Sequence, residues 1–142
     1  MPSIAAFYIT TDLIVWLPPG VDDAPLVAAL DKPLLYQSAG RAVADDGRVY
    51  LPFACSEQAG LAADLEALLT AIESLPHEAR AVWDAAGSRT LSIGLQGGTT
   101  PHAVTETLAS PVVSRIAACG AAVELVLYAA HAADAADDAE RR

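Results

Sequence analysis

The chain has 142 residues, a mass of 14.7 kDa and a formal net charge of −10. This is the usual size of one domain, so the sequence predicts a single domain with one core. Eighteen acidic residues stand against eight basic ones. That balance disfavours binding to nucleic acid or to an anionic membrane surface, because both depend on clustered Lys and Arg.

The cysteine count and the apolar runs exclude two further classes of protein. Two cysteines cannot build a disulfide scaffold, and the strictly apolar run at residues 13–17 is far shorter than the roughly 20 residues of a bilayer helix. The first residues carry no basic region typical of a secretory signal. We therefore expect a cytoplasmic protein in which Cys55 and Cys119 are small buried side chains rather than nucleophiles.

The first third of the chain alternates between strand and turn signals. Residues 4–9 predict a strand, and residues 13–17 are either a second strand or its continuation, which a Pro-Pro-Gly run ends. A short helix follows, capped by Asp22 or Asp23, with a proline in its first turn. Pro33 ends that helix.

The middle of the chain predicts a hairpin and then two helices. Extended segments at residues 34–43 and 48–55 flank Asp45-Asp46-Gly47, which is typical of a hairpin with a type I′ turn. Leucine and isoleucine then recur at helical spacing over residues 61–75. Pro76 closes this helix and opens a second one, which we expect Gly87 to end.

The last third predicts strand, helix and strand around one ambiguous segment. Residues 89–95 alternate as a strand does. Residues 96–108 stay open, because Thr100-Pro101 can begin a helix whereas residues 104–108 have β character. A helix from Ser110-Pro111 to Gly120 and a strand at residues 123–129 complete the chain.

The resulting order is strand, helix, hairpin, helix, strand, helix, strand, which is an α+β pattern. Its first six elements match the βαββαβ ferredoxin-like motif, followed by an extra helix–strand unit. We expect helices packed on one face of a largely antiparallel or mixed sheet, in one domain over residues 1–130. After His131 only Ala, Asp, Glu and Arg remain, so residues 131–142 predict a frayed or disordered acidic tail.

Several short segments follow one another in a recognisable order. They are Leu30-Asp31-Lys32-Pro33 followed by Gly40, the leucine-rich helix, Leu91-Ser92-Ile93-Gly94, Ser110-Pro111 leading to Ile116 through Ala121, and Val126-Leu127-Tyr128. Together they resemble the bacterial domain-of-unknown-function family numbered 4279, over roughly residues 7–128. That family has no established catalytic motif, so the resemblance implies no catalytic residue. It implies similarity to immunity or accessory proteins of bacterial gene clusters.

The glycine-rich stretch at residues 94–102 is the most suggestive sequence for chemistry. A glycine-rich turn before a helix can present free N–H groups to an anion, although the P-loop lysine is missing and a flexible loop explains the stretch as well. His102 and Glu106 share a face if the segment is helical, as a solvated pair or as an oriented imidazole. Thr99, Thr100, His102 and Glu106 are therefore candidate binding residues.

Trp16 is the first choice for an interface residue. If residues 13–17 form an edge strand, its outward apolar side chains need a cover, either the core, a second copy or a partner. Arg41 and Arg48 flank the predicted hairpin turn and complete the candidate binding set. Pairing with acidic neighbours such as Asp46 explains both arginines without a function.

The sequence assigns no catalytic residue, no metal ligand and no cofactor, because no catalytic or zinc-binding motif occurs in it. We expect a non-enzymatic protein-binding module, immunity-like or accessory, that acts by occluding the surface of a protein partner of basic character, or that pairs as a homodimer. The alternative is a small-molecule-binding protein or accessory biosynthetic enzyme. Its pocket would lie between sheet and helices, with His102, Glu106, Asp12 or Tyr8 as polar groups.

Overall fold

The computed structural model describes residues 3–57, 59–100 and 103–130. They form an α+β fold with one mixed sheet in the strand order β2-β4-β1-β5-β6, in which β3 also pairs with β4. The strands are β1 (Phe7–Leu17), β2 (Leu35–Tyr36), β3 (Ala42–Val43), β4 (Val49–Ala54), β5 (Ser88–Gln96) and β6 (Ala122–Tyr128). All neighbours are antiparallel except β5 and β6, which run parallel.

β1 is one continuous strand at the centre of the sheet. Apart from Asp12, its residues all favour strands. The two threonines that could have turned the chain stay extended, with only a register shift between Tyr8 and Thr10. β1 pairs with β4 on one side and with β5 on the other. The hypothesis that residues 13–17 form an edge strand is therefore wrong.

The predicted hairpin forms, but with a different turn. Ala42 and Val43 pair with Tyr50 and Val49, and Ala44 donates its N–H to the carbonyl of Arg48 at 2.8 Å. Three residues are left in the turn, so only its last one, Gly47, takes a positive φ of 86°. The type I′ prediction was wrong because that turn needs two such residues. The 3₁₀ turn Ser38–Gly40 also interrupts the predicted strand at residues 34–43.

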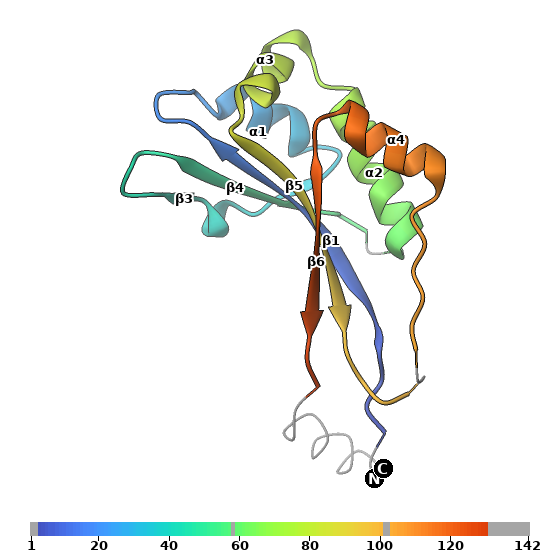
Figure 1. Cartoon of the computed structure of the whole chain (residues 1–142). Coiled ribbons are helices and arrows are strands. Elements are labelled where there is room, and N and C mark those ends of the chain that lie inside the picture. The colour runs from blue at the N-terminus through green and yellow to red at the C-terminus, as the bar shows by residue number, and fades with distance from the viewer. Residues whose placement is uncertain (1–2, 58, 101–102, 131–142) are drawn as a thin grey trace.

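The helices lie on one face of the sheet (Figure 1). They are α1 (Ala24–Leu30), α2 (Leu61–Glu73), α3 (His77–Ala85) and α4 (Ser110–Ala118). Gly120, with a φ of 74°, ends the segment after α4 as expected, whereas Gly87 has no positive φ and is no left-handed cap for α3. None of the described helices is long and apolar enough to cross a membrane.

The core fills the layer between sheet and helices. Its largest side chains are less than 2% exposed: Trp83, Phe53, Leu13, Leu17, Leu26, Leu30, Leu51, Leu65, Leu68, Leu69 and Ile72. On β1 the odd-numbered residues 11–17 point into this layer, while the even-numbered residues 10–16 are only partly buried and face away from it. We call that second side of the sheet the open face.

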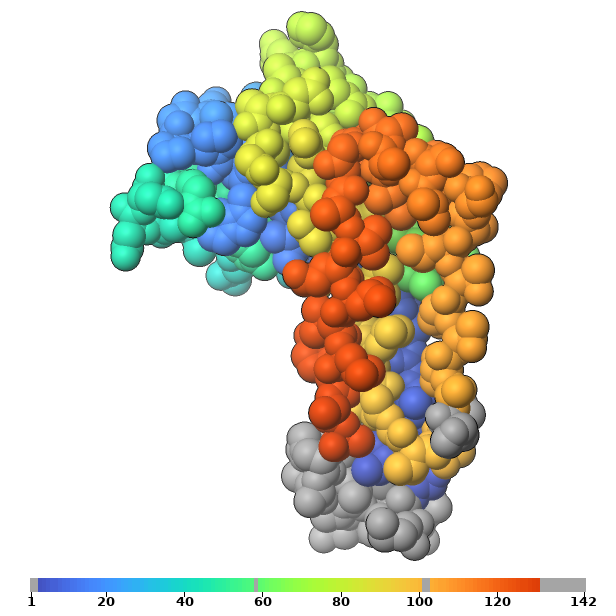
Figure 2. All heavy atoms as spheres, in the orientation of Figure 1, coloured from blue at the N-terminus to red at the C-terminus, as the bar shows by residue number. Residues whose placement is uncertain are grey.

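Part of the sheet extends past the helices (Figures 1 and 2). We call this extension the β-arm; it consists of residues 7–11, 93–96 and 125–128, and its root at Thr11 and Ile93 is still buried. Beside it, residues 103–109 contain neither helix nor strand, so neither alternative for the ambiguous segment forms there. Thr100 instead makes a parallel bridge with Ala5. The predicted tail at residues 131–142 lies outside the described residues.

Candidate functional site

A buried polar cluster ties the root of the β-arm to α2. The Tyr8 hydroxyl donates to Asp64 Oδ2 at 2.5 Å and lies 2.8 Å from Thr11 Oγ1. Asp64 is 1% exposed and also accepts the N–H of Ala59 at 3.1 Å. Burial, and then the hydrogen bond to Asp64, raises the pKa of Tyr8 well above its usual range. Asp64 and Thr11 are buried, and these hydrogen bonds connect β1 to α2.

Cys55 borders the same cluster. Its thiol faces the backbone oxygens of Thr11 and Asp64 at 3.8 and 3.6 Å. Burial, and then the charges of nearby carboxylates, raises the pKa of Cys55 to about 12. Burial likewise raises the pKa of Cys119. Both cysteines therefore stay protonated at neutral pH, which a nucleophile would not.

The polar groups expected in a pocket between sheet and helices do not converge there. Tyr8 points into the helix layer, whereas Asp12 points to the open face of the same strand. Glu106 is exposed in the irregular segment, and His102 lies outside the described residues. Among the residues that the structure describes, no three His, Cys, Asp or Glu side chains come together as a metal site.

The glycine-rich turn uses its N–H groups within the chain. Thr99 and Thr100 donate theirs to the carbonyl of Ile4 at 2.7 and 3.0 Å, and Gly97 donates to the carbonyl of Tyr128 at 2.8 Å. A side chain at Gly98 would lie 2.6 Å from the carbonyl carbon of Ala5, so glycine allows the two backbones to approach. The turn closes the tip of the β-arm, and these three N–H groups are not available to an anion.

Trp16 and the two candidate arginines lie at the other end of the sheet. Trp16 packs edge-on against Tyr50, with ring centroids 5.2 Å apart, and the Arg48 guanidinium lies 5.0 Å from the Trp16 ring centroid. Arg48 also pairs with Asp46 at 2.7 Å. Arg41 pairs instead with Asp23 at 2.9 Å, so the structure does not join the two arginines in one site.

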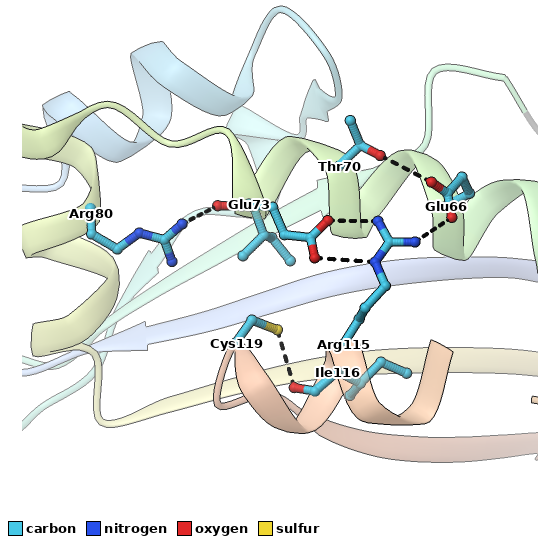
Figure 3. Close-up of polar contacts among 8 residues, drawn as sticks. Glu66, Thr70, Glu73, Arg80, Arg115, Ile116 and Cys119 are labelled. Carbon is cyan, nitrogen blue, oxygen red and sulfur yellow. Dashed lines mark hydrogen bonds and ion pairs between the residues drawn. The ribbon is translucent and has the colours of Figure 1, made fainter. Parts of the chain in front are cut away.

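Arg115 fastens α4 to α2 (Figure 3). Its guanidinium donates to both carboxylate oxygens of Glu73, at 3.1 and 2.6 Å, and to Glu66 at 2.5 Å. These contacts lower the pKa of both glutamates. Since α4 is the crossover between the parallel strands β5 and β6, the same contacts fix where β6 begins.

β6 is the most exposed of the longer strands, and most of its exposed residues are apolar. Leu125 is 68% exposed and Leu127 is 69% exposed, and Val123 lies on the same side of the strand. Glu124 is its one charged residue. Within the described chain β6 pairs only with β5, so its other edge is free, and Figure 2 shows it running along the front of the β-arm.

The sequence predicted the strand β6 but did not indicate that it is exposed. Its composition, AVELVLY, is typical of a parallel strand buried on both faces. The position of β6 in the chain could have indicated its exposure. It follows a complete βαββαβ pattern, and a strand added after such a pattern lies at the edge of the sheet. An apolar strand at an edge needs a cover.

Comparison with family models, with curated proteins and with solved structures gave no match. The resemblance to the family numbered 4279 therefore stays a prediction.

Proposed function

We propose that this protein is a non-enzymatic protein-binding module that takes an extended segment of another protein along the free edge of β6. One observation carries the proposal: a seven-residue apolar strand ends the sheet with no described segment against its outer edge. Such an edge offers a row of backbone N–H and C=O groups, and adding a strand to it satisfies them.

The edge lacks the usual protection against pairing. Natural edge strands are shortened, bulged, or carry Lys or Pro. β6 contains neither Lys nor Pro. It is seven residues long, and its pairing with β5 is regular from Ala122 to Tyr128. Its single carboxylate, on Glu124, accepts the hydroxyl of Ser92 at 2.9 Å on the open face. This lack of protection supports the proposal that the free edge of β6 pairs with a strand of a partner.

The charge of the chain favours a basic partner over a second copy. Two copies would bring net charges of −10 together, whereas a basic protein is attracted and guided to the surface. We expect the bound segment to place apolar side chains beside Val123, Leu125 and Leu127, and basic ones on the open-face side, beside Glu124.

The strand order supports the finer fold assignment as part of this proposal. α1 connects β1 to β2, and β4 lies between these two strands in the sheet. α2 and α3 connect β4 to β5, and β1 lies between those two strands. These are two split βαβ units, as in a ferredoxin-like core, with α4 and β6 added. An immunity-like or accessory role in the bacterial cytoplasm, in which binding occludes the partner's surface, is the biological form we propose.

The test is a titration of the protein against the products of genes adjacent to its own. Leu125→Lys together with Leu127→Lys should weaken binding by about a hundredfold or more, because edge lysines block strand addition. Leu35→Lys is the matched control, since Leu35 is a half-exposed leucine on the opposite edge strand β2. Equal affinity of the double and control variants would refute the proposal.

Light scattering on the same variants tests whether a second copy of the chain, rather than a partner segment, binds the β6 edge. If the wild-type chain is a dimer that the double variant dissociates and the control leaves intact, a second copy occupies the edge instead. That result also overturns the proposal of a basic partner segment. A monomeric wild-type chain supports it.

A further inference from the structure

The open face of the β-arm carries a groove of about 410 Å³ that the proposed strand addition does not use. Two cross-strand rows contribute to it, through Asp12 and Ser92 at one end and Gln96 and Tyr128 at the other. Asp12, Ser92 and Glu124 are register partners on β1, β5 and β6, and so are Phe7, Gln96 and Tyr128 toward the tip. Gly94 lies between the rows and leaves the floor of the groove without a side chain.

Two polar side chains of this groove have their donor groups already engaged within the chain. The Ser92 hydroxyl donates a hydrogen bond to Glu124 Oε1 at 2.9 Å. The Gln96 amide nitrogen donates to the carbonyls of Gly97 and Tyr128 at 2.9 and 3.3 Å. The hydroxyl oxygen of Ser92 and the amide oxygen of Gln96 remain as acceptors. A ligand that supplies hydrogen-bond donors can satisfy both oxygens.

Two groups in the groove lack partners. The Asp12 carboxylate is half-buried, and among the described residues nothing forms a hydrogen bond or ion pair with it. Thr10 Oγ1, two residues earlier on the same face, is buried and has no hydrogen-bond partner in the described chain. Partly buried charges and buried hydroxyls are normally paired, because leaving them unpaired costs free energy.

We propose that this groove binds an organic cation, an ammonium or guanidinium group, between the Asp12 and Ser92 side chains and the Tyr128 ring. The cation satisfies the carboxylate and the acceptor oxygens together, and the aromatic side chain adds a favourable face for positive charge. Among the described residues, no Lys or Arg lines the groove to compete for Asp12. The cation is either a small amine or a Lys or Arg side chain on a protein.

The experiment is an NMR titration of the isotope-labelled full chain at low salt with three molecules of equal chain length. They are 1,4-diaminobutane, the neutral 1,4-butanediol and the dianion succinate. We expect saturable shifts of the Thr10, Asp12, Ser92 and Gly94 amides with the diamine and none with the other two. Equal shifts with the diol, or shifts confined to residues elsewhere, overturn the proposal.

Two variants test the groove itself. Asp12→Asn removes the charge at constant shape and should weaken diamine binding at least about tenfold. Asp45→Asn makes the same charge change in the exposed hairpin turn and should have no effect. Gly94→Ala adds a Cβ 3.5 Å from the Thr10 carbonyl oxygen and 3.6 Å from Tyr128 Cε2, which are ordinary contacts, so the variant folds while its methyl group occupies the floor.

A second titration identifies the source of the cation. It uses a short lysine-containing peptide whose two ends are blocked, so that the lysine side chain is its only ammonium group. Binding of the peptide but not of the free diamine assigns the groove to a protein side chain, and the reverse assigns it to a small amine. If neither binds the wild-type chain, the proposal fails. The proposal for the β6 edge is untouched by that failure, because Leu125 and Leu127 do not line the groove.

Discussion

β1 passes through two regions of the molecule that have opposite characters. In its second half Leu13, Val15 and Leu17 are fully buried under the helices, whereas Phe7 at its start is 50% exposed. β5 repeats the pattern, with Leu91 buried and Gln96 partly exposed in the β-arm. The same strands thus build a closed core at one end and an uncovered sheet at the other (Figure 1).

The difference lies in what covers the sheet rather than in the strands. β6 has the composition of a core strand, yet its side chains Leu125 and Leu127 stay exposed. Apolar residues that stay exposed over a contiguous patch mark interaction surfaces in soluble proteins. The helix-covered end therefore holds the core, and the β-arm carries the two surfaces to which our proposals refer.

The largest predicted effect contrasts one residue from each region. Trp83 is 1% exposed and donates its indole N–H to the Cys119 carbonyl at 3.0 Å, so Trp83→Ala should lower the free energy of unfolding by about 3–5 kcal/mol. Leu127→Ala in the β-arm should change it by no more than about 0.5 kcal/mol. Urea denaturation measures both, and similar losses would contradict the division into two regions.

A second prediction concerns the tip of the β-arm. Gly98→Ala places a Cβ 2.6 Å from the carbonyl carbon of Ala5, so residues 3–6 have to move away from residues 97–100 at a cost of about 1–3 kcal/mol. Hydrogen exchange should then accelerate at the amides of Ala6 and Thr99 while the core amides keep their relative order. Gly87→Ala, whose nearest neighbour is 3.8 Å away, is the control and should leave exchange at the tip unchanged.

Sequence patterns predicted the covered region better than the β-arm. The leucine spacing of α2 and the proline–glycine boundaries of α4 are local signals, and the structure confirms both helices. The mixed α+β class followed from the order of those elements. The position of β1 did not, because pairing partners depend on contacts far apart in sequence.

The candidate sites depended still more on long-range pairing. Asp12, Ser92 and Glu124 form one row only because three strands align in register, and no spacing along the chain reports that. Trp16 drew attention as a tryptophan in an apolar run, yet its strand is central and its ring packs on Tyr50. Local residue type predicted which side chains were unusual, and topology decided where they lie.

A third prediction follows from the unpaired Asp12. Burial raises the pKa of this carboxyl in the folded chain, so the folded state holds the proton more tightly than the unfolded state. Stability therefore falls as pH rises from below the ordinary value of 3.8 through the raised folded value. At neutral pH Asp12→Asn should stabilise the fold by about 1 kcal/mol, and the gain should vanish in acid. A destabilised variant at neutral pH would show that the carboxylate has a partner.

The smallest predicted effect tests the contact between α4 and α2 in the helix-covered region. Arg115 lowers the pKa of Glu66 and Glu73, so its contribution to stability is present above their ordinary value of 4.5 and is lost as pH falls through the lowered values. Arg115→Met should reduce Tm at about pH 7, by less as salt is added, because the pairs are exposed to solvent. Near pH 2 the two proteins should melt together. A Tm difference that persists in acid would mean that the stem of Arg115 supports α4 by packing rather than by charge.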